Sequence, residues 1–105
     1  MSRLDQLKKL HAADPADADV MYMLAQEHAK AGDHAGAVGW YDRCLLASPA
    51  YHYAYFHKAK SQQASGDLGG ALATLREGRA RATKASDAKA AGELGAYLEE
   101  LEDGR

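Results

Sequence analysis

Five histidines and one cysteine are the side chains of this sequence with the clearest capacity for metal or nucleophilic chemistry. Two histidines on one helical face can bind a metal ion when they are four residues apart, and no pair in this chain has that spacing. His28 and His57 fall on neighbouring predicted helices, so a metal or small-ligand site between them is the alternative to simple packing. Cys44 falls on an apolar stripe, where a thiol is structural rather than reactive. The sequence therefore predicts no enzyme, no catalytic residue, no bound metal and no cofactor.

The balance of charge and the single cysteine exclude several other classes of protein. There are 13 lysines and arginines against 15 aspartates and glutamates, which gives a formal net charge of -2. Nucleic-acid-binding domains usually have a clear basic excess, so we expect no nucleic-acid partner. One cysteine cannot form an internal disulfide, and no apolar run approaches the ~18 residues of a membrane span. The first residues are too polar for a signal peptide, so we expect a cytoplasmic location and no membrane partner.

Alanine and proline content defines the secondary-structure class. The chain contains 23 alanines and only 2 prolines, and alanine is the strongest helix former whereas proline is the strongest breaker. β-Branched residues are too few for strands. The sequence therefore predicts an all-α fold of about six helices. Their expected bounds are residues 4–12, Asp17 or Asp19 to Gly32, Asp33 to Pro49, residues 51–64, Asp67 to about Ala82, and Ser86 or Asp87 to Leu101.

Apolar residues recur at helical spacing along these segments and define the expected core. The expected core side chains are Met21, Leu24, Ala25, His28, Ala37, Val38, Tyr41, Cys44, Leu45, Leu68, Ala71, Leu72, Leu75, Ala82, Leu94, Tyr97, Leu98 and Leu101. Two charged clusters near the end of the chain are expected to stay in solvent or to pair with each other. They are the basic cluster Arg76, Arg79, Arg81 and Lys84 and the acidic cluster Glu99, Glu100, Glu102 and Asp103.

An internal repeat is visible when the sequence is compared with itself at a shift of 34 residues. The shift aligns Gly32-Asp33 with Gly66-Asp67, Ala25 with Ala59, Ala37 with Ala71, and Pro15 with Pro49. These are small or turn-forming residues, which backbone geometry and close helix contact require. A helix–turn–helix period of this length is typical of tetratricopeptide repeats, and at these positions the sequence resembles that family. It departs from the family pattern at His28, Cys44, Lys58, Gly78 and Thr83.

The resemblance implies an α-α superhelix, that is, a tetratricopeptide-like solenoid of antiparallel helix pairs that spans residues 1–105 as a single domain. The implied divisions are a partial repeat helix over 1–16, a first repeat over 17–50, a second repeat over 51–84 and a capping helix over 85–105. On the capping helix, the polar residues Lys89, Glu93, Glu99 and Glu100 are expected on the outer side, where they seal the open end of the solenoid.

A solenoid of this family presents a concave surface lined by the first helices of its repeats. The groove-facing positions implied by the resemblance are Asp19, Tyr22, Met23, Gln26, Tyr53, Phe56, His57 and Lys60. Aromatic residues and methionine are enriched at interface cores. The resemblance thus implies a non-catalytic protein–protein interaction module or scaffold that binds a peptide or helix of a partner in this groove. Two alternatives are that the rings pack against one another or the last helix, and that the same patch forms a homodimer.

Some members of the family hold the terminal carboxylates of a chaperone partner with basic and amide side chains on successive first helices. The corresponding positions of this chain are Tyr22, Gln26, His57, Asp87 and Ala91. That carboxylate clamp is absent, and Asp87 would repel a carboxylate. We therefore expect a partner other than a chaperone tail.

Overall fold

The computed structural model describes residues 2–104. Within this range the chain forms six helices and no strand, which confirms the predicted all-α fold. The helices are α1 (Arg3–Ala13), α2 (Ala18–Lys30), α3 (His34–Ala47), α4 (His52–Ala64), α5 (Leu68–Lys84) and α6 (Ala88–Asp103). Every helix expected from the sequence is present, with ends close to the predicted ones.

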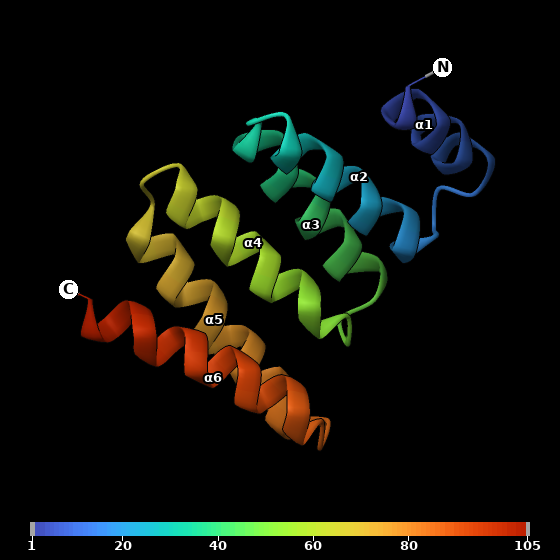
Figure 1. The fold of residues 1–105 in the computed structure, drawn as a ribbon. Helices are drawn as coiled ribbons and strands as arrows, with labels where there is room; N and C mark the ends of the chain where they lie inside the picture. The colour runs from blue at the N-terminus through green and yellow to red at the C-terminus, as the bar shows by residue number, and fades with distance from the viewer. Residues whose placement is uncertain (1, 105) are drawn as a thin grey trace.

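The helices stack as hairpins in two layers. α2 packs against α3, and α4 packs against α5. α2, α4 and α6 lie in one layer, whereas α3 and α5 lie behind them in the other (Figure 1). α1 packs against α2 at one end of the stack, and α6 packs against α5 and α4 at the other. This is the expected solenoid of antiparallel helix pairs.

Aspartates define where most of the helices begin. The side chains that cap α2, α3, α5 and α6 are those of Asp17, Asp33, Asp67 and Asp87. Asp33 accepts a hydrogen bond from the Gly36 amide at 3.0 Å, and Asp67 accepts one from the Gly70 amide at 2.9 Å. Each bond satisfies a backbone donor that the first turn of a helix leaves unpaired. Because Asp33 and Asp67 are one repeat apart, the sequence repeat is also a repeat of this capping.

Glycine makes the turn inside each hairpin. Gly32 follows α2 with a φ of 81°, and Gly66 follows α4 with a φ of 85°. Residues with a side chain avoid this left-handed region. A Cβ at either position would meet no atom within 4 Å, so the backbone conformation and not crowding selects glycine. The predicted turns at these two positions are confirmed.

The buried side chains form three adjoining clusters along the stack. Leu7, Val20 and Leu24 join α1 and α2. Met21, Ala25, Ala37, Tyr41, Cys44 and Ala54 join α2, α3 and the start of α4. Tyr55, Ala59, Ala71, Leu72, Leu75, Ala82, Ala90, Leu94, Tyr97, Leu98 and Leu101 join α4, α5 and α6. Burial of this apolar surface is the main force that holds the hairpins together.

The predicted core is confirmed at most positions and wrong at Leu68. That side chain is 36% exposed, because it is the first residue of α5 and borders an open surface groove next to Gly66 and Leu101. His28, Val38 and Leu45, also predicted to be buried, are half-buried. None of the helices within residues 2–104 has the length and apolar character needed to cross a membrane.

We expect the stability of the fold to fall as the pH is lowered from about 5 to about 3. Hydrogen bonds from the Gly36 amide and from His28 hold the pKa of Asp33 below its usual value. Bonds from the Ala90 amide and from His52 do the same to the pKa of Asp87. The unfolded chain, whose aspartates have a pKa of about 3.9, therefore binds more protons than the folded chain in this range. The stabilisation is complete above that pKa and is lost as the pH falls through the lower folded value.

Thermal melts followed by circular dichroism across this pH range measure the effect. The double variant Asp33→Asn/Asp87→Asn keeps side-chain acceptors at both caps but removes the charges, so its melting temperature should fall less steeply with acid. Asp103→Asn removes a charge at the exposed end of α6 and should follow the wild type. A double variant that declines as steeply as the wild type would contradict the assignment.

Candidate functional site

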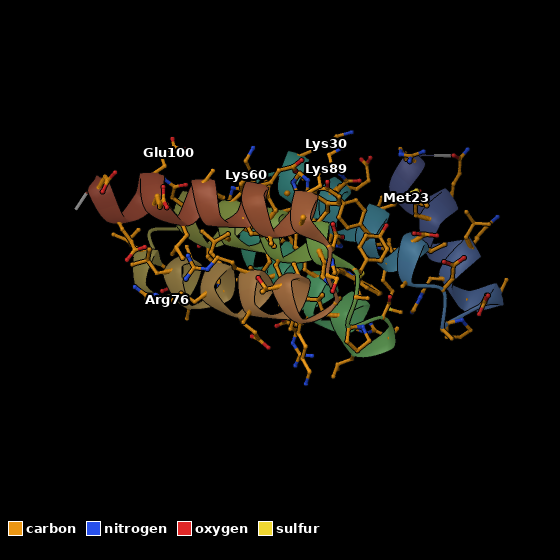
Figure 2. All side chains as sticks on the ribbon, turned by 90° about the horizontal axis from the view of Figure 1, so that it is seen from below. Met23, Lys30, Lys60, Arg76, Lys89 and Glu100 are labelled. Atoms are coloured by element: carbon orange, nitrogen blue, oxygen red, sulfur yellow. The ribbon has the colours of Figure 1, made fainter. Side chains whose placement is uncertain are left out.

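The eight side chains predicted to bind a partner all lie on α2 or α4, in one layer of the stack. Figure 2 shows Met23 of α2 and Lys60 of α4 on the same side of the molecule as Glu100 of α6, with Arg76 of α5 on the opposite side. Asp19, Tyr53 and Lys60 are exposed, and Tyr22, Met23, Gln26, Phe56 and His57 are half-buried. The predicted surface is therefore accessible, although its aromatic members are partly covered.

Tyr22 stacks on Tyr51, which was not among the predicted partner-binding residues. The rings of Tyr22 and Tyr51 are stacked, with centroids 4.9 Å apart. The Tyr51 hydroxyl donates a hydrogen bond to Asp19 Oδ1 at 2.8 Å. Burial and this bond raise the pKa of Tyr51, so its hydroxyl stays protonated. Tyr51 was missed because it precedes α4, whereas the family positions lie inside the first helices.

His57 lies at the centre of the ring cluster, which we define as Tyr22, Tyr41, Tyr51 and His57. Its imidazole contacts Tyr22 edge to face at 5.6 Å and is stacked with Tyr41 at 6.4 Å. Burial and the nearby charge of Lys60 lower the pKa of His57, so the ring is neutral at neutral pH. The cluster is therefore an uncharged group of rings that joins α2, α3 and α4, with Tyr41 buried and the other three rings half-buried.

Phe56 continues the aromatic surface toward α6. Its ring contacts Tyr97 of α6 at 5.0 Å and His57 at 5.5 Å. Lys60 Nζ lies over the Phe56 ring, 5.4 Å from the centroid. These contacts match the alternative in which the rings pack against one another and against the last helix. Phe56 nevertheless remains half-buried and open to solvent on one side.

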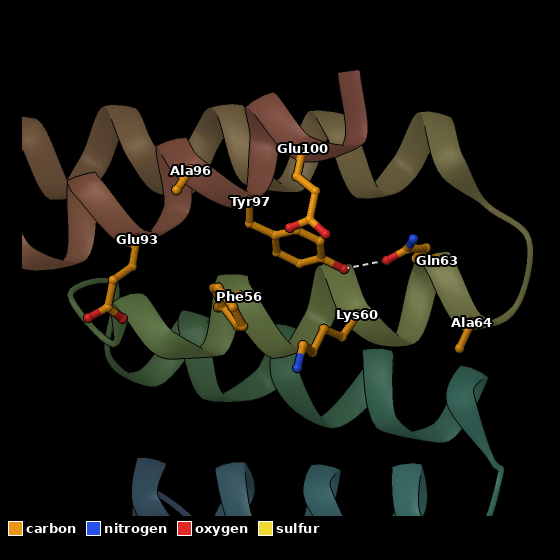
Figure 3. Close-up of a pocket in the computed structure, with 8 residues that line it drawn as sticks. All are labelled: Phe56, Lys60, Gln63, Ala64, Glu93, Ala96, Tyr97 and Glu100. Carbon is orange, nitrogen blue, oxygen red and sulfur yellow. Dashed lines mark hydrogen bonds between the residues drawn. The ribbon is translucent and has the colours of Figure 1, made fainter. Parts of the chain in front are cut away.

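An open groove of about 790 Å³ separates α4 from α6, and we call it the α4–α6 groove (Figure 3). Its lining residues are Phe56, Lys60, Gln63, Ala64, Glu93, Ala96, Tyr97 and Glu100. The Tyr97 hydroxyl donates a hydrogen bond to Gln63 Oε1 at 2.6 Å, which ties the two walls together at the floor. Phe56, Ala96 and Tyr97 make this floor apolar and aromatic.

The predicted position is wrong for two acidic residues of the last helix. Glu93 and Glu100 were expected on the outer side of the capping helix, but both line the α4–α6 groove. The available signal was the position of the last helix as the first helix of a further repeat. In that position it adds a third helix to the layer of α2 and α4 and forms the second wall of the groove. Gln63 and Ala96 were missed for the same reason, and Tyr97 was predicted only as a core residue.

The remaining predicted residues are less closely joined to this surface. Met23 lies at the α1 end, where its sulfur is 3.6 Å from the Arg3 guanidinium. Arg3 in turn pairs with Glu27 at 3.0 Å. Gln26 and Tyr53 make no side-chain hydrogen bond or ring contact within residues 2–104. The structure thus groups Asp19, Tyr22, Phe56, His57 and Lys60 and leaves the other three at the margins.

His28, His57 and Cys44 do not come together in one site within residues 2–104. His28 Nδ1 is 2.9 Å from Asp33 Oδ2, at the turn between α2 and α3, while His57 lies among the rings. No group of three or more potential metal ligands occurs within the described part of the chain. Cys44 is fully buried, and burial raises the pKa of its thiol to about 11, which keeps it protonated and unreactive.

One ion pair joins the two charged clusters near the end of the chain. Arg76 of α5 lies 3.4 Å from Glu102 of α6, as the sequence suggested for these clusters. Arg81 pairs instead with Glu77 on its own helix. Both pairs are exposed, so their contribution to stability is small.

No family model matches this chain, and no curated protein matches its sequence. Solved structures do match. The TPR2B domain of yeast Sti1, in its complex with pHsp70, superposes with a TM-score of 0.86 and 22% identity over 97% of this chain and 82% of that chain. PcrH, in complex with the chaperone binding region of PopD, gives 0.85 and 25% over 95% and 76%. A tetratricopeptide repeat domain protein from Salinibacter ruber gives 0.78 and 27% over 86% and 91%.

Proposed function

We propose that this chain, which has the tetratricopeptide-repeat fold, is a non-catalytic interaction module that binds a peptide or helix of a partner protein. The observation that carries the proposal is the α4–α6 groove, whose open floor is formed by Phe56, Ala96 and Tyr97 and adjoins the ring cluster. Two neighbours in fold support it, since Sti1 TPR2B and PcrH were each solved in complex with a partner. We also propose that α2–α3 and α4–α5 are the two repeats, with α1 as a partial repeat and α6 as the cap.

Binding in the groove would gain most of its energy from burial of the exposed part of the Phe56 ring, since Tyr97 is only 9% exposed. Phe56 and Tyr97 are already held in place by contacts with each other, so little side-chain freedom is lost when a partner covers them. Gln63 Oε1 is occupied by the Tyr97 hydroxyl, which leaves the amide nitrogen of Gln63 to donate to a partner carbonyl. A few such anchors usually supply most of the binding energy of an interface.

The structure also supports a partner other than a carboxylate tail. Asp87, at one of the clamp positions, caps α6 and lies 3.0 Å from His52 Nδ1. His57, at another, is neutral and packed among the rings. Neither can supply a positive charge to a terminal carboxylate in this arrangement. The pHsp70 partner of Sti1 is therefore not carried over to this chain.

Filling the groove tests the proposal. Ala96→Arg places a long side chain at an exposed position of α6 on the groove floor, so it should block binding without disturbing the core. Peptides selected on the wild-type chain from a random display library should bind this variant about tenfold or more weakly. Ala80→Arg makes the same change at an exposed position of α5, outside the groove, and should leave the affinity unchanged.

The measurement is titration calorimetry on the three proteins, after circular dichroism has shown equal helicity. Equal affinity for all three would contradict binding in the groove, as would failure to select any peptide. Sedimentation velocity at several concentrations accompanies it. A dimer that Ala96→Arg dissociates would show that a second copy of the chain occupies the groove in place of another protein.

A further inference from the structure

The α6 wall of the α4–α6 groove carries two carboxylates that form no ion pair within residues 2–104. These carboxylates belong to Glu93 and Glu100, which both line the groove. They are seven residues apart on one helix, which is two turns or roughly 10 Å along its axis. Figure 3 shows the two side chains extending from the same side of α6 over the groove.

Three other glutamates do form ion pairs, and their surroundings differ from those of Glu93 and Glu100. Glu27 contacts Arg3 and Lys30, Glu77 contacts Arg81, and Glu102 contacts Arg76. Each of those carboxylates therefore has a basic neighbour within the chain, on the outside of the stack or at its α1 end. The carboxylates of the groove wall instead face a surface that is open to a partner.

The one cation among the lining residues lies over the floor of the groove and is paired with neither carboxylate. Lys60 Nζ lies 5.4 Å from the centroid of the Phe56 ring and forms no ion pair with either groove carboxylate. The remaining lining residues are uncharged. The groove thus has an apolar floor and a net negative charge, with the negative groups concentrated on the α6 wall.

Glu100 also acts on the floor of the groove. Burial raises the pKa of Tyr97, and the charge of the nearby Glu100 carboxylate raises it further. The Tyr97 hydroxyl is therefore kept in its protonated form, the form that donates to Gln63. A partner in the groove therefore contacts both the apolar floor and the carboxylates above it.

We infer that the α4–α6 groove selects a partner segment in which an apolar side chain lies between two basic side chains about 10 Å apart. This inference rests on the proposed function and specifies the chemistry of the partner. A polyproline II segment has three residues per turn and a rise of about 3.1 Å per residue, so basic residues three positions apart lie on one edge at roughly the required distance. The apolar residue between them then points toward the Phe56–Tyr97 floor.

Two matched probe peptides test the inference. One is Gly-Ser-Lys-Pro-Leu-Lys-Ser-Gly, and the other has glutamate in place of both lysines. Each is titrated into the isotope-labelled chain while the backbone amide resonances are followed by NMR. The lysine peptide should shift resonances of residues 56–64 and 93–100 and bind about tenfold more tightly than the glutamate peptide.

Charge reversal in the groove provides the second arm. Glu93→Lys/Glu100→Lys should weaken the lysine peptide by about tenfold and improve the glutamate peptide. Glu99→Lys/Asp103→Lys makes the same change of net charge on exposed positions of α6 outside the groove, so it should leave the preference for lysine intact. Retention of helicity in both variants is checked by circular dichroism.

Three results would overturn the inference. They are equal binding of both peptides to the wild-type chain, an equal loss in the groove variant and the control variant, and no binding of the lysine peptide. None of these bears on whether library-selected peptides lose affinity for Ala96→Arg. Failure of the charge preference is therefore distinguishable from failure of the proposed function.

Discussion

Gly78→Ala should lower the free energy of unfolding by about 1 to 3 kcal/mol, although alanine is the better helix former. A Cβ built at Gly78 would stand 2.6 Å from Tyr55 Cβ and 2.7 Å from Tyr55 Cγ. Tyr55 is 3% exposed, and its Cβ cannot move away by rotation of the side chain. α4 and α5 would have to separate to admit the methyl group, and this outweighs the gain in helix propensity of about 1 kcal/mol.

Gly92→Ala is the matched control. Gly92 lies in α6, and a Cβ there would meet no atom within 4 Å. The substitution should therefore raise the free energy of unfolding by about 0.5 to 1 kcal/mol. Urea denaturation of both variants measures the difference. Stabilisation by both substitutions would show that α4 and α5 are not packed as closely as described.

Tyr41→Ala should lower the free energy of unfolding by about 3 to 5 kcal/mol, the largest single effect that we expect. Tyr41 is 1% exposed and fills the centre of the cluster that joins α2, α3 and α4. Its ring also contacts Tyr22 at 5.8 Å and His57 at 6.4 Å, so it is the buried member of the ring cluster on which these two rings pack. Leu46→Ala removes a side chain that is 84% exposed and should change the free energy by less than about 0.5 kcal/mol.

The loss from Tyr41→Ala should be unequal along the chain. Each hairpin of a solenoid contacts mainly its neighbours, so damage to one need not spread evenly. Amide hydrogen exchange should accelerate most in α2 and α3 and least in α5 and α6, whose core is separate. Uniform acceleration over all helices would contradict this description and indicate a single cooperative core.

The helices and their ends could be predicted because local chemistry determines them. Asp33 and Asp67 cap helices through their own side chains, and Gly32 and Gly66 adopt a backbone conformation that few residues tolerate. Such signals lie within a few residues of the feature that they specify. Their recurrence at one period then indicated how the helices stack.

The details of the site depended on contacts between helices, which the sequence records only weakly. Nothing in the spacing of Tyr22 predicts that it stacks on Tyr51, which precedes a different helix. Gly78 stands where the family prefers alanine, because Tyr55 approaches its backbone so closely. That approach is visible only in the assembled hairpin. The α6 wall of the groove was missed because the polar residues of the last helix were expected on its outer side.

The central claim is that a partner segment binds in the α4–α6 groove, and chemical-shift mapping of a library-selected peptide tests it most directly. We predict that the largest changes fall on residues 56–64 of α4 and 93–100 of α6, with smaller ones in the ring cluster. A second groove, lined by Leu45, Leu46, Pro49 and Tyr55, lies between α3 and α5. Changes centred on that groove, with the α4–α6 groove undisturbed, would contradict the account.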